Sequence, residues 1–119
     1  MIADKLFRRV CQVADRFLLI ARTKAARDQF DLSQHAQQEA ADEQISVDDI
    51  KHAILTGAEL ELYPHDPRGP SCLMVGQDQS HRWIHVVCGN FDRENLLVIT
   101  VYLPRPPKWQ DPWTRRGKP

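Results

Sequence analysis

The chain has 119 residues, 42% of them hydrophobic and 27% charged, which is typical of one globular domain and excludes collagenous, disordered and membrane-embedded chains. Sixteen basic and sixteen acidic residues give a net charge of zero, so bulk charge gives no sign of nucleic-acid binding. Three cysteines without a CxxC pair favour a reducing compartment. The apolar run at residues 17–21 is too short for a signal peptide or membrane span. We therefore expect a soluble cytoplasmic protein.

The charges are unevenly distributed along the chain. Residues 1–33 carry a net charge of +3, residues 34–62 carry −6, residues 63–103 carry −1, and residues 104–119 carry +4. Any site for an anionic ligand therefore depends on a local basic patch rather than on the whole chain.

The first predicted element is a helix over about residues 4–28. Leu6, Val10, Val13, Phe17 and Ile20 recur at a 4-3-4-3 spacing, which indicates an amphipathic helix with a heptad-like seam. The helix can pack on its own domain, form a homodimer through these five residues, or lie on a membrane surface. We divide the chain into a helical extension (1–30), a domain (31–113) and a basic tail (114–119).

Two shorter helices follow. Ser33 is the predicted N-cap of a helix that reaches Gln44. The next helix begins after Ser46, where two acidic residues follow in the pattern of a capping box. Gly57 is its natural end.

The pattern then changes from helices to strands. Prolines at positions 104, 106 and 107 end the strand region, because proline cannot donate to a β-ladder. Helices followed by strands predict an α+β fold, with two to three N-terminal helices and an antiparallel meander of about four strands. The predicted strands are Glu59–Tyr63, Cys72–Gly76, Trp83–Cys88 and Leu96–Leu103.

The chain shows no zinc-ligand spacing, phosphate loop or nucleophile elbow, and we expect no metal or cofactor. Metal-free RNA cleavage needs a base, an acid and cations that face the phosphorane charge. The register of the last hairpin is not fixed by the sequence, so His85 and Tyr102 can equally be packing residues. The candidate catalytic residues are His35, His85, Thr100 and Tyr102, and the candidate substrate-binding residues are Arg68, Arg82, Trp109, Arg115 and Arg116.

The basic tail adds a second pattern. Trp109 and Trp113 stand among Arg115 and Arg116. Aromatic and cationic side chains in this mixture can stack on bases and hold phosphates. The alternative is that a tryptophan packs over the sheet edge while the arginines are solvated.

Several short motifs, in order, resemble a bacterial domain-of-unknown-function family, number 4258. They are Ser33-Gln34-His35-Ala36, Ile45-Ser46, Asp49-Ile50, Gly57, Tyr63-Pro64, Cys72–Gly76, Ile84–Cys88, Val98–Tyr102 and Trp109. The resemblance covers about residues 33–113. It implies an α+β fold similar to RelE-like and microbial-ribonuclease-like toxins of toxin–antitoxin pairs, often with a small zinc-finger antitoxin as partner.

By position, the resemblance aligns His35 and His85 with the family's histidines, and Thr100 and Tyr102 with its terminal strand. Members usually carry basic residues where this chain has Glu39 and Glu43. Three hypotheses follow for the function. The chain is a metal-independent endoribonuclease of the mRNA interferase type, a non-catalytic module whose acidic helices bind a basic partner, or a structural homodimer.

Overall fold

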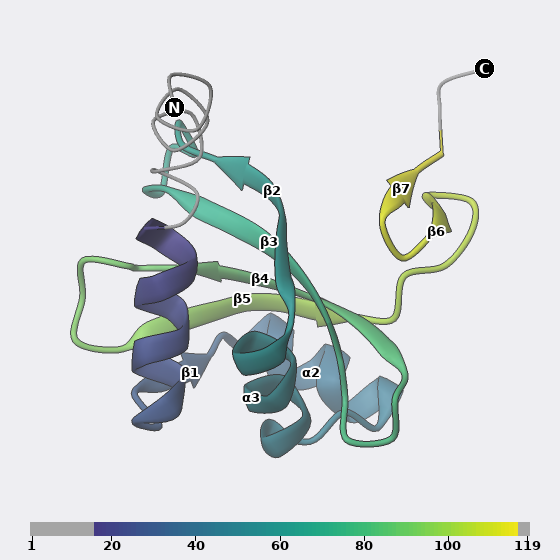
Figure 1. The fold of residues 1–119 in the computed structure, drawn as a ribbon, viewed down its shortest axis with the longest axis horizontal. Helices are drawn as coiled ribbons and strands as arrows, with labels where there is room; N and C mark the ends of the chain where they lie inside the picture. The colour runs from purple at the N-terminus through teal and green to yellow at the C-terminus, as the bar shows by residue number, and fades with distance from the viewer. Residues whose placement is uncertain (1–15, 117–119) are drawn as a thin grey trace, which may run out of the picture.

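The computed structural model describes residues 16–116 and has an α+β fold (Figure 1). The N-terminal helix, in its described part, covers residues 16–26. The other elements are β1 (Phe30–Leu32), α2 (Gln34–Glu43), α3 (Val47–Thr56), β2 (Ala58–Tyr63), β3 (Ser71–Gln77), β4 (Trp83–Gly89), β5 (Leu96–Tyr102), β6 (Trp109–Asp111) and β7 (Thr114–Arg115).

Five strands form the main sheet in the order β1-β5-β4-β3-β2. The predicted antiparallel meander is confirmed as β2 to β5. The sheet as a whole is mixed, because β1 pairs with β5 in parallel, with Phe30 beside Leu96 and Leu32 beside Val98. The sequence did not predict β1, since three residues between two helices are too few to show a strand period. The small β6–β7 hairpin was also missed.

Local capping fixes both predicted short helices. Ser33 is the N-cap of α2, and its hydroxyl oxygen accepts a hydrogen bond from the Ala36 N–H at 3.0 Å. Ser46 and Asp49 form the predicted capping box at the start of α3. Gly57 caps the end of α3. The side-chain bonds at both N-caps satisfy amides that a helix start leaves without an intrahelical partner.

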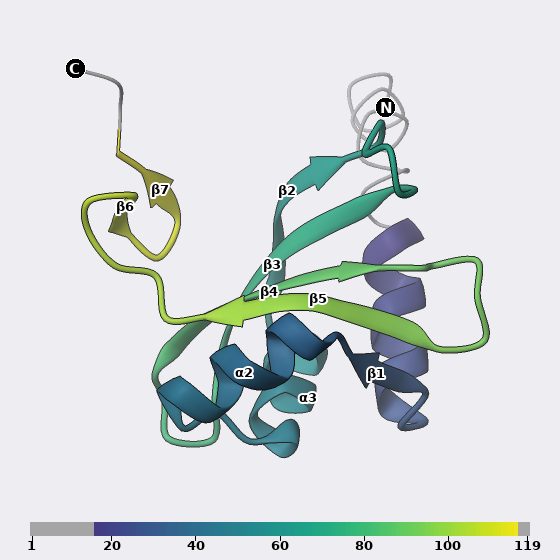
Figure 2. The same ribbon diagram turned by 180° about the vertical axis from the view of Figure 1, so that it is seen from behind.

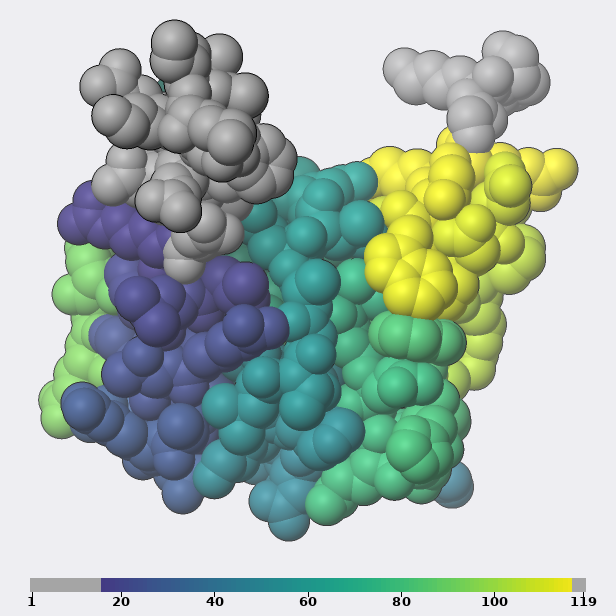
Figure 3. Space-filling model, viewed as in Figure 1, coloured from purple at the N-terminus to yellow at the C-terminus, as the bar shows by residue number. Residues whose placement is uncertain are grey.

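The N-terminal helix packs on the same core as α3 and one face of the sheet. Ala21 and Ala25 are fully buried, and the ring centres of Phe17 and Phe91 lie 4.6 Å apart. Figure 3 shows the helix in purple, close against the rest of the molecule. Of the predicted dimer seam, Phe17 and Ile20 contact this core, while the other three residues lie outside the described range. Within residues 16–116, no helix is long and apolar enough to cross a membrane.

The backbones of α3 and β3 approach each other closely at Gly76. A Cβ at this position would lie 2.5 Å from the Ala53 carbonyl oxygen and 2.9 Å from the Ala53 Cβ. Neither atom can rotate away, because one is backbone and the other is attached directly to it. Gly76 therefore sets the distance between α3 and the sheet.

We predict that Gly76→Ala lowers the free energy of unfolding by roughly 1–3 kcal/mol, because the added methyl group overpacks the contact between α3 and β3. Chemical denaturation followed by circular dichroism measures this change. Gly89→Ala is the matched control. Its Cβ would make one tight contact, with the mobile end of the Ile99 side chain at 3.0 Å, and an ordinary contact with the Pro70 carbonyl oxygen at 3.7 Å. Equal losses of stability in both variants would contradict the prediction.

Candidate functional site

The register of β4 and β5 places the candidate strand residues on one face of the sheet. His85 pairs with Tyr102, and Val87 pairs with Thr100. A β-bulge follows, because Cys88 then pairs with Val98. Side chains of directly paired residues point to the same side of a sheet. These four side chains therefore share the face opposite the main core, an arrangement that the sequence left open.

A cleft of about 390 Å³ lies over this face. One wall comes from α2, the other comes from the segment that follows β5, and the floor comes from the sheet. In Figure 2, α2 lies along β5 and the β6–β7 hairpin lies beyond the end of β5. The residues lining the cleft are His35, Glu39, Tyr63, Leu73, Val87, Thr100, Tyr102, Lys108 and Arg115.

The α2 wall carries an imidazole–carboxylate pair. His35 Nε2 lies 3.2 Å from Glu39 Oε1, and the two residues are one helical turn apart. The His35 side chain is 71% exposed, whereas that of Glu39 is only 23% exposed. Because Glu39 holds Nε2, the other ring nitrogen, Nδ1, is left to exchange a proton with a ligand.

Glu39 is itself fixed to the edge of β5. The Val101 N–H donates a hydrogen bond to Glu39 Oε1 at 3.1 Å, and the Thr100 hydroxyl donates to the same oxygen. The Glu39 carboxylate thus accepts the hydrogen bond of a β5 edge amide, in the part of β5 that no longer pairs with β1. Thr100 supports the position of Glu39 in this arrangement.

Glu43, one turn further along α2, forms a two-point ion pair. Arg105 donates to its two carboxylate oxygens at 2.8 and 3.0 Å. The sequence resemblance leads us to expect basic residues at the positions of Glu39 and Glu43. The structure gives each of them a specific cationic or hydrogen-bonding partner, so neither is a bare negative charge facing the cleft.

The opposite wall is organised around Arg115. Its guanidinium donates two hydrogen bonds to Glu61, both at 2.7 Å, and lies 4.7 Å from the Trp109 ring centre. The bond from Arg115 holds the pKa of Glu61 below its usual value. Burial raises the pKa of Tyr63, which donates to Glu61, to about 12. Lys108 Nζ lies 5.8 Å from the Tyr102 ring centre, which adds a second cation to this wall.

His85 is fully buried beneath the C-terminal hairpin. Its Nε2 lies 2.6 Å from the Pro112 carbonyl oxygen, which can only accept, so Nε2 carries the proton. Burial lowers the pKa of His85, so the ring is neutral and Nδ1 accepts a hydrogen bond from the Tyr102 hydroxyl at 3.1 Å. The Trp109 ring packs edge-on against the His85 imidazole, with the two ring centres 4.4 Å apart. This geometry makes His85 a positioning residue that anchors the second wall.

The remaining candidate residues do not line the cleft. Arg68 is 76% exposed and lines a neighbouring hollow. Arg82 pairs with Asp78 at 2.6 Å and donates to two carbonyls at the end of α2, so it caps a helix. Trp109 is 1% exposed and packs on His85. Arg116 is exposed.

Sequence reasoning missed Lys108, Tyr63 and the supporting role of Glu39. Lys108 directly precedes Trp109, but its place in the cleft depends on how the chain folds back after β5. Within residues 16–116, no three His, Cys, Asp or Glu side chains gather closely enough to hold a metal ion.

Comparison with known families places the chain in one of them. Residues 32–103 match the model described as "Domain of unknown function (DUF4258)", which is more than half of the 119 residues. The chain therefore belongs to this family, as its motifs suggested. No curated protein and no solved structure matches the chain significantly.

The buried His85 makes stability depend on pH. Its pKa is lowered in the folded state from an ordinary value of 6.5, so the unfolded chain binds the proton more readily than the folded chain. The free energy of unfolding should therefore be highest above pH 6.5 and decrease as the pH falls, by about 1.4 kcal/mol for each unit of pKa difference. Urea unfolding between pH 8 and pH 5 measures this.

The His85→Gln variant tests the assignment of this slope. It should be less stable at pH 8 by roughly 1–3 kcal/mol, because buried partners lose a bond, and its stability should vary less with pH. The exposed His65→Gln variant is the control and should keep the wild-type slope. If the free energy of unfolding changes with pH equally in wild type and His85→Gln, His85 is not held neutral in the folded chain.

Proposed function

We propose that the protein is a metal-independent endoribonuclease, and that its active site is the cleft between α2 and the C-terminal hairpin. The observation that carries this proposal is the His35–Glu39 pair, held at 3.2 Å on the rim of a cleft that Lys108 and Arg115 also line. An oriented imidazole beside two cations meets the needs of phosphodiester cleavage without a metal: proton transfer and stabilisation of a developing anion.

The proposed reaction uses the 2′-hydroxyl of RNA as the nucleophile. His35 Nδ1 takes the 2′-hydroxyl proton, and the 2′-oxygen then attacks the adjacent phosphorus. The bond from phosphorus to the 5′-oxygen breaks, which leaves a 2′,3′-cyclic phosphate, and the departing oxygen takes a proton from the Lys108 ammonium group. The N–H groups of Arg115 that do not bond to Glu61 would face the charge that develops on the phosphorane. Glu39 holds the Nε2 side of the imidazole at 3.2 Å and so orients Nδ1 towards the substrate.

We further propose, from the sequence resemblance alone, that this activity is that of a toxin in a bacterial toxin–antitoxin pair. In this proposal the fold is RelE-like, the protein acts in the cytoplasm, and a small antitoxin, of the zinc-finger type in related pairs, neutralises it. An antitoxin that covers the cleft would block access of RNA to His35, Lys108 and Arg115 together. Acidic side chains on the antitoxin would suit the two cations.

We predict that His35→Ala lowers the rate of RNA cleavage by about 10²- to 10⁴-fold, the usual contribution of a general acid–base group. The measurement is cleavage of a labelled RNA by purified protein with excess chelator present. In cells, controlled expression of wild type should arrest growth with decay of total RNA, and His35→Ala should relieve both effects. Because His35 is exposed, the variant should fold normally.

His81→Asn is the matched control for this experiment. His81 is an exposed histidine in the turn before β4 with a φ of 68°, a conformation that asparagine tolerates well. Its activity should equal that of wild type. Normal growth and intact RNA on expression of soluble, folded wild type would refute the nuclease proposal.

A second candidate function is a non-catalytic interaction module, and one observation favours it. Trp83 and Trp113 form an exposed pair, with ring centres 4.4 Å apart and exposures of 36% and 47%. Exposed tryptophans are enriched at protein interfaces. Loss of partner binding in Trp113→Ala, with unchanged RNA integrity in cells that express wild type, would support this function instead.

A further inference from the structure

A second hollow, of about 290 Å³, adjoins the proposed active site. His35 lines both this hollow and the cleft, so the two meet at the proposed catalytic imidazole. The volume lies at the small end of ligand pockets, which suits a single planar group. Its lining is Ser33, His35, Asp66, Arg68, Gly69, Pro70, Gly89, Asn90, Leu97 and Ile99.

The floor of this hollow is apolar. Leu97 and Ile99 lie there half-buried on β5, and Gly89 on β4 contributes no side chain. A Cβ on Gly89 would lie only 3.0 Å from Ile99 Cδ1, so the glycine leaves this part of the floor flat. A flat apolar floor between polar edges is complementary to the face of an aromatic ring.

The rim carries a positioned guanidinium. The backbone N–H of Arg68 donates to Asp66 Oδ1 at 3.1 Å, and its Nε lies 3.5 Å from the same oxygen. Ser71 donates to the other oxygen of Asp66 at 3.0 Å. The Arg68 N–H holds the pKa of Asp66 below its usual value. Asp66 thus fixes the loop through the Arg68 backbone and lies beside the Nε edge of the exposed guanidinium, whose terminal N–H groups remain for a ligand.

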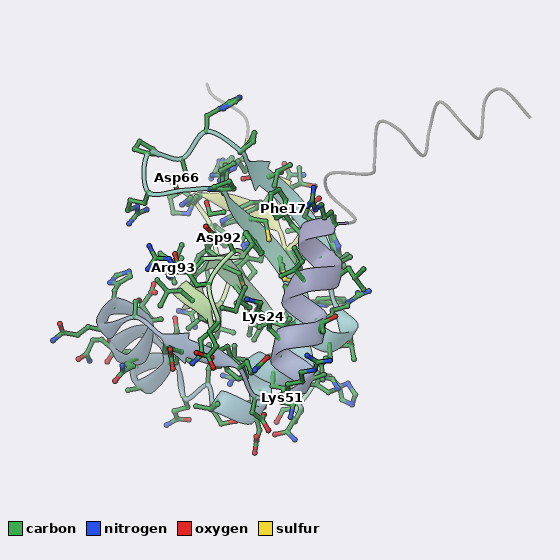
Figure 4. The ribbon with its side chains drawn as sticks, turned by 90° about the vertical axis from the view of Figure 1, so that its left-hand side faces the viewer. Phe17, Lys24, Lys51, Asp66, Asp92 and Arg93 are labelled. Atoms are coloured by element: carbon green, nitrogen blue, oxygen red, sulfur yellow. The ribbon has the colours of Figure 1, made fainter. Side chains whose placement is uncertain are left out.

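Asn90 lines the same hollow and adds hydrogen-bonding capacity. Its backbone has a φ of 58°, and its carboxamide has no hydrogen-bond partner among residues 16–116. In Figure 4 the loop that carries Asp66 lies above the loop that carries Asp92 and Arg93. Asn90 is the first residue of this second loop, because β4 ends at Gly89, so the polar groups of the hollow come from two separate turns.

We infer that this hollow binds the base of the nucleotide on the 5′ side of the cleaved phosphate and that it prefers guanine. The inference rests on the proposed function. A base on the floor next to His35 brings the 2′-hydroxyl of its own ribose towards His35 Nδ1. The planar fork of arginine pairs with the adjacent acceptors O6 and N7 of guanine, whereas adenine presents an amino donor beside N7. Cytosine also presents two adjacent acceptors, N3 and O2, but the larger purine ring covers more of the apolar floor.

The first test measures binding and does not depend on cleavage. Guanosine, adenosine, cytidine and uridine 3′-monophosphates are titrated into the full-length wild type by isothermal calorimetry. We expect guanosine 3′-monophosphate to bind at least about tenfold more tightly than the others, which corresponds to one good bidentate contact. Similar dissociation constants for all four nucleotides would overturn the inference.

Two variants separate base recognition from charge. Arg68→Lys keeps the positive charge but removes the fork, so it should reduce the preference for guanine to less than about threefold while phosphate binding persists. Arg93→Ala removes an exposed arginine of the neighbouring loop and should keep the wild-type preference. A preference that survives in Arg68→Lys would exclude Arg68 as the base-reading residue. Circular dichroism confirms that each variant is folded.

The second test separates this inference from the proposed function. Four RNA oligonucleotides that differ only in the base before the scissile phosphate are cleaved by wild type. Faster cleavage after guanine, lost in Arg68→Lys, supports both proposals. Equal cleavage after every base overturns the base pocket but leaves the nuclease intact. Guanine-selective binding without cleavage of any RNA supports the pocket and overturns the nuclease.

Discussion

The outer edge of β5 controls the position of the α2 wall. β1 pairs with the first part of this edge, and beyond it the Ser33 N–H donates to the Val98 carbonyl while its hydroxyl donates to the Ile99 carbonyl at 2.7 Å. Glu39 then accepts from Val101. Unpaired strand-edge groups are costly if buried and a route to aggregation if exposed. The bonds that satisfy this edge also attach α2 to the sheet and bring His35 over its open face.

The opposite wall of the cleft depends on a different buried bond. His85 on β4 donates to the Pro112 carbonyl, which ties the C-terminal segment across the sheet. Arg115 then reaches Glu61 on β2. These two contacts connect residues that are 27 and 54 positions apart in the chain. The basic C-terminal segment is thereby folded onto the cleft as its cationic wall.

The same contacts change what the uneven distribution of charge along the chain implies for the cleft. The segment at residues 34–62 carries a net charge of −6, yet Glu39 is bound to β5, Glu43 to Arg105 and Glu61 to Arg115. Each carboxylate positions a neighbour in or beside the cleft. Lys108 adds a cation to the same region. The net charge around the cleft therefore differs from what the net charges of the separate chain segments indicate.

The sequence by itself determined the α+β class, both short helices with their caps, the four meander strands and the family. Capping boxes, glycine stops and period-two apolar runs act over a few residues, so they can be recognised in a sequence. Tertiary structure alone decided the parallel β1, the register that pairs His85 with Tyr102, and the assembly of His35, Lys108 and Arg115 around one cleft. These features depend on hydrogen bonds between distant residues, and no local pattern specifies which distant group will be the partner. For that reason His85 reads as a candidate catalytic group in the sequence, whereas the folded chain buries it as the anchor of the hairpin.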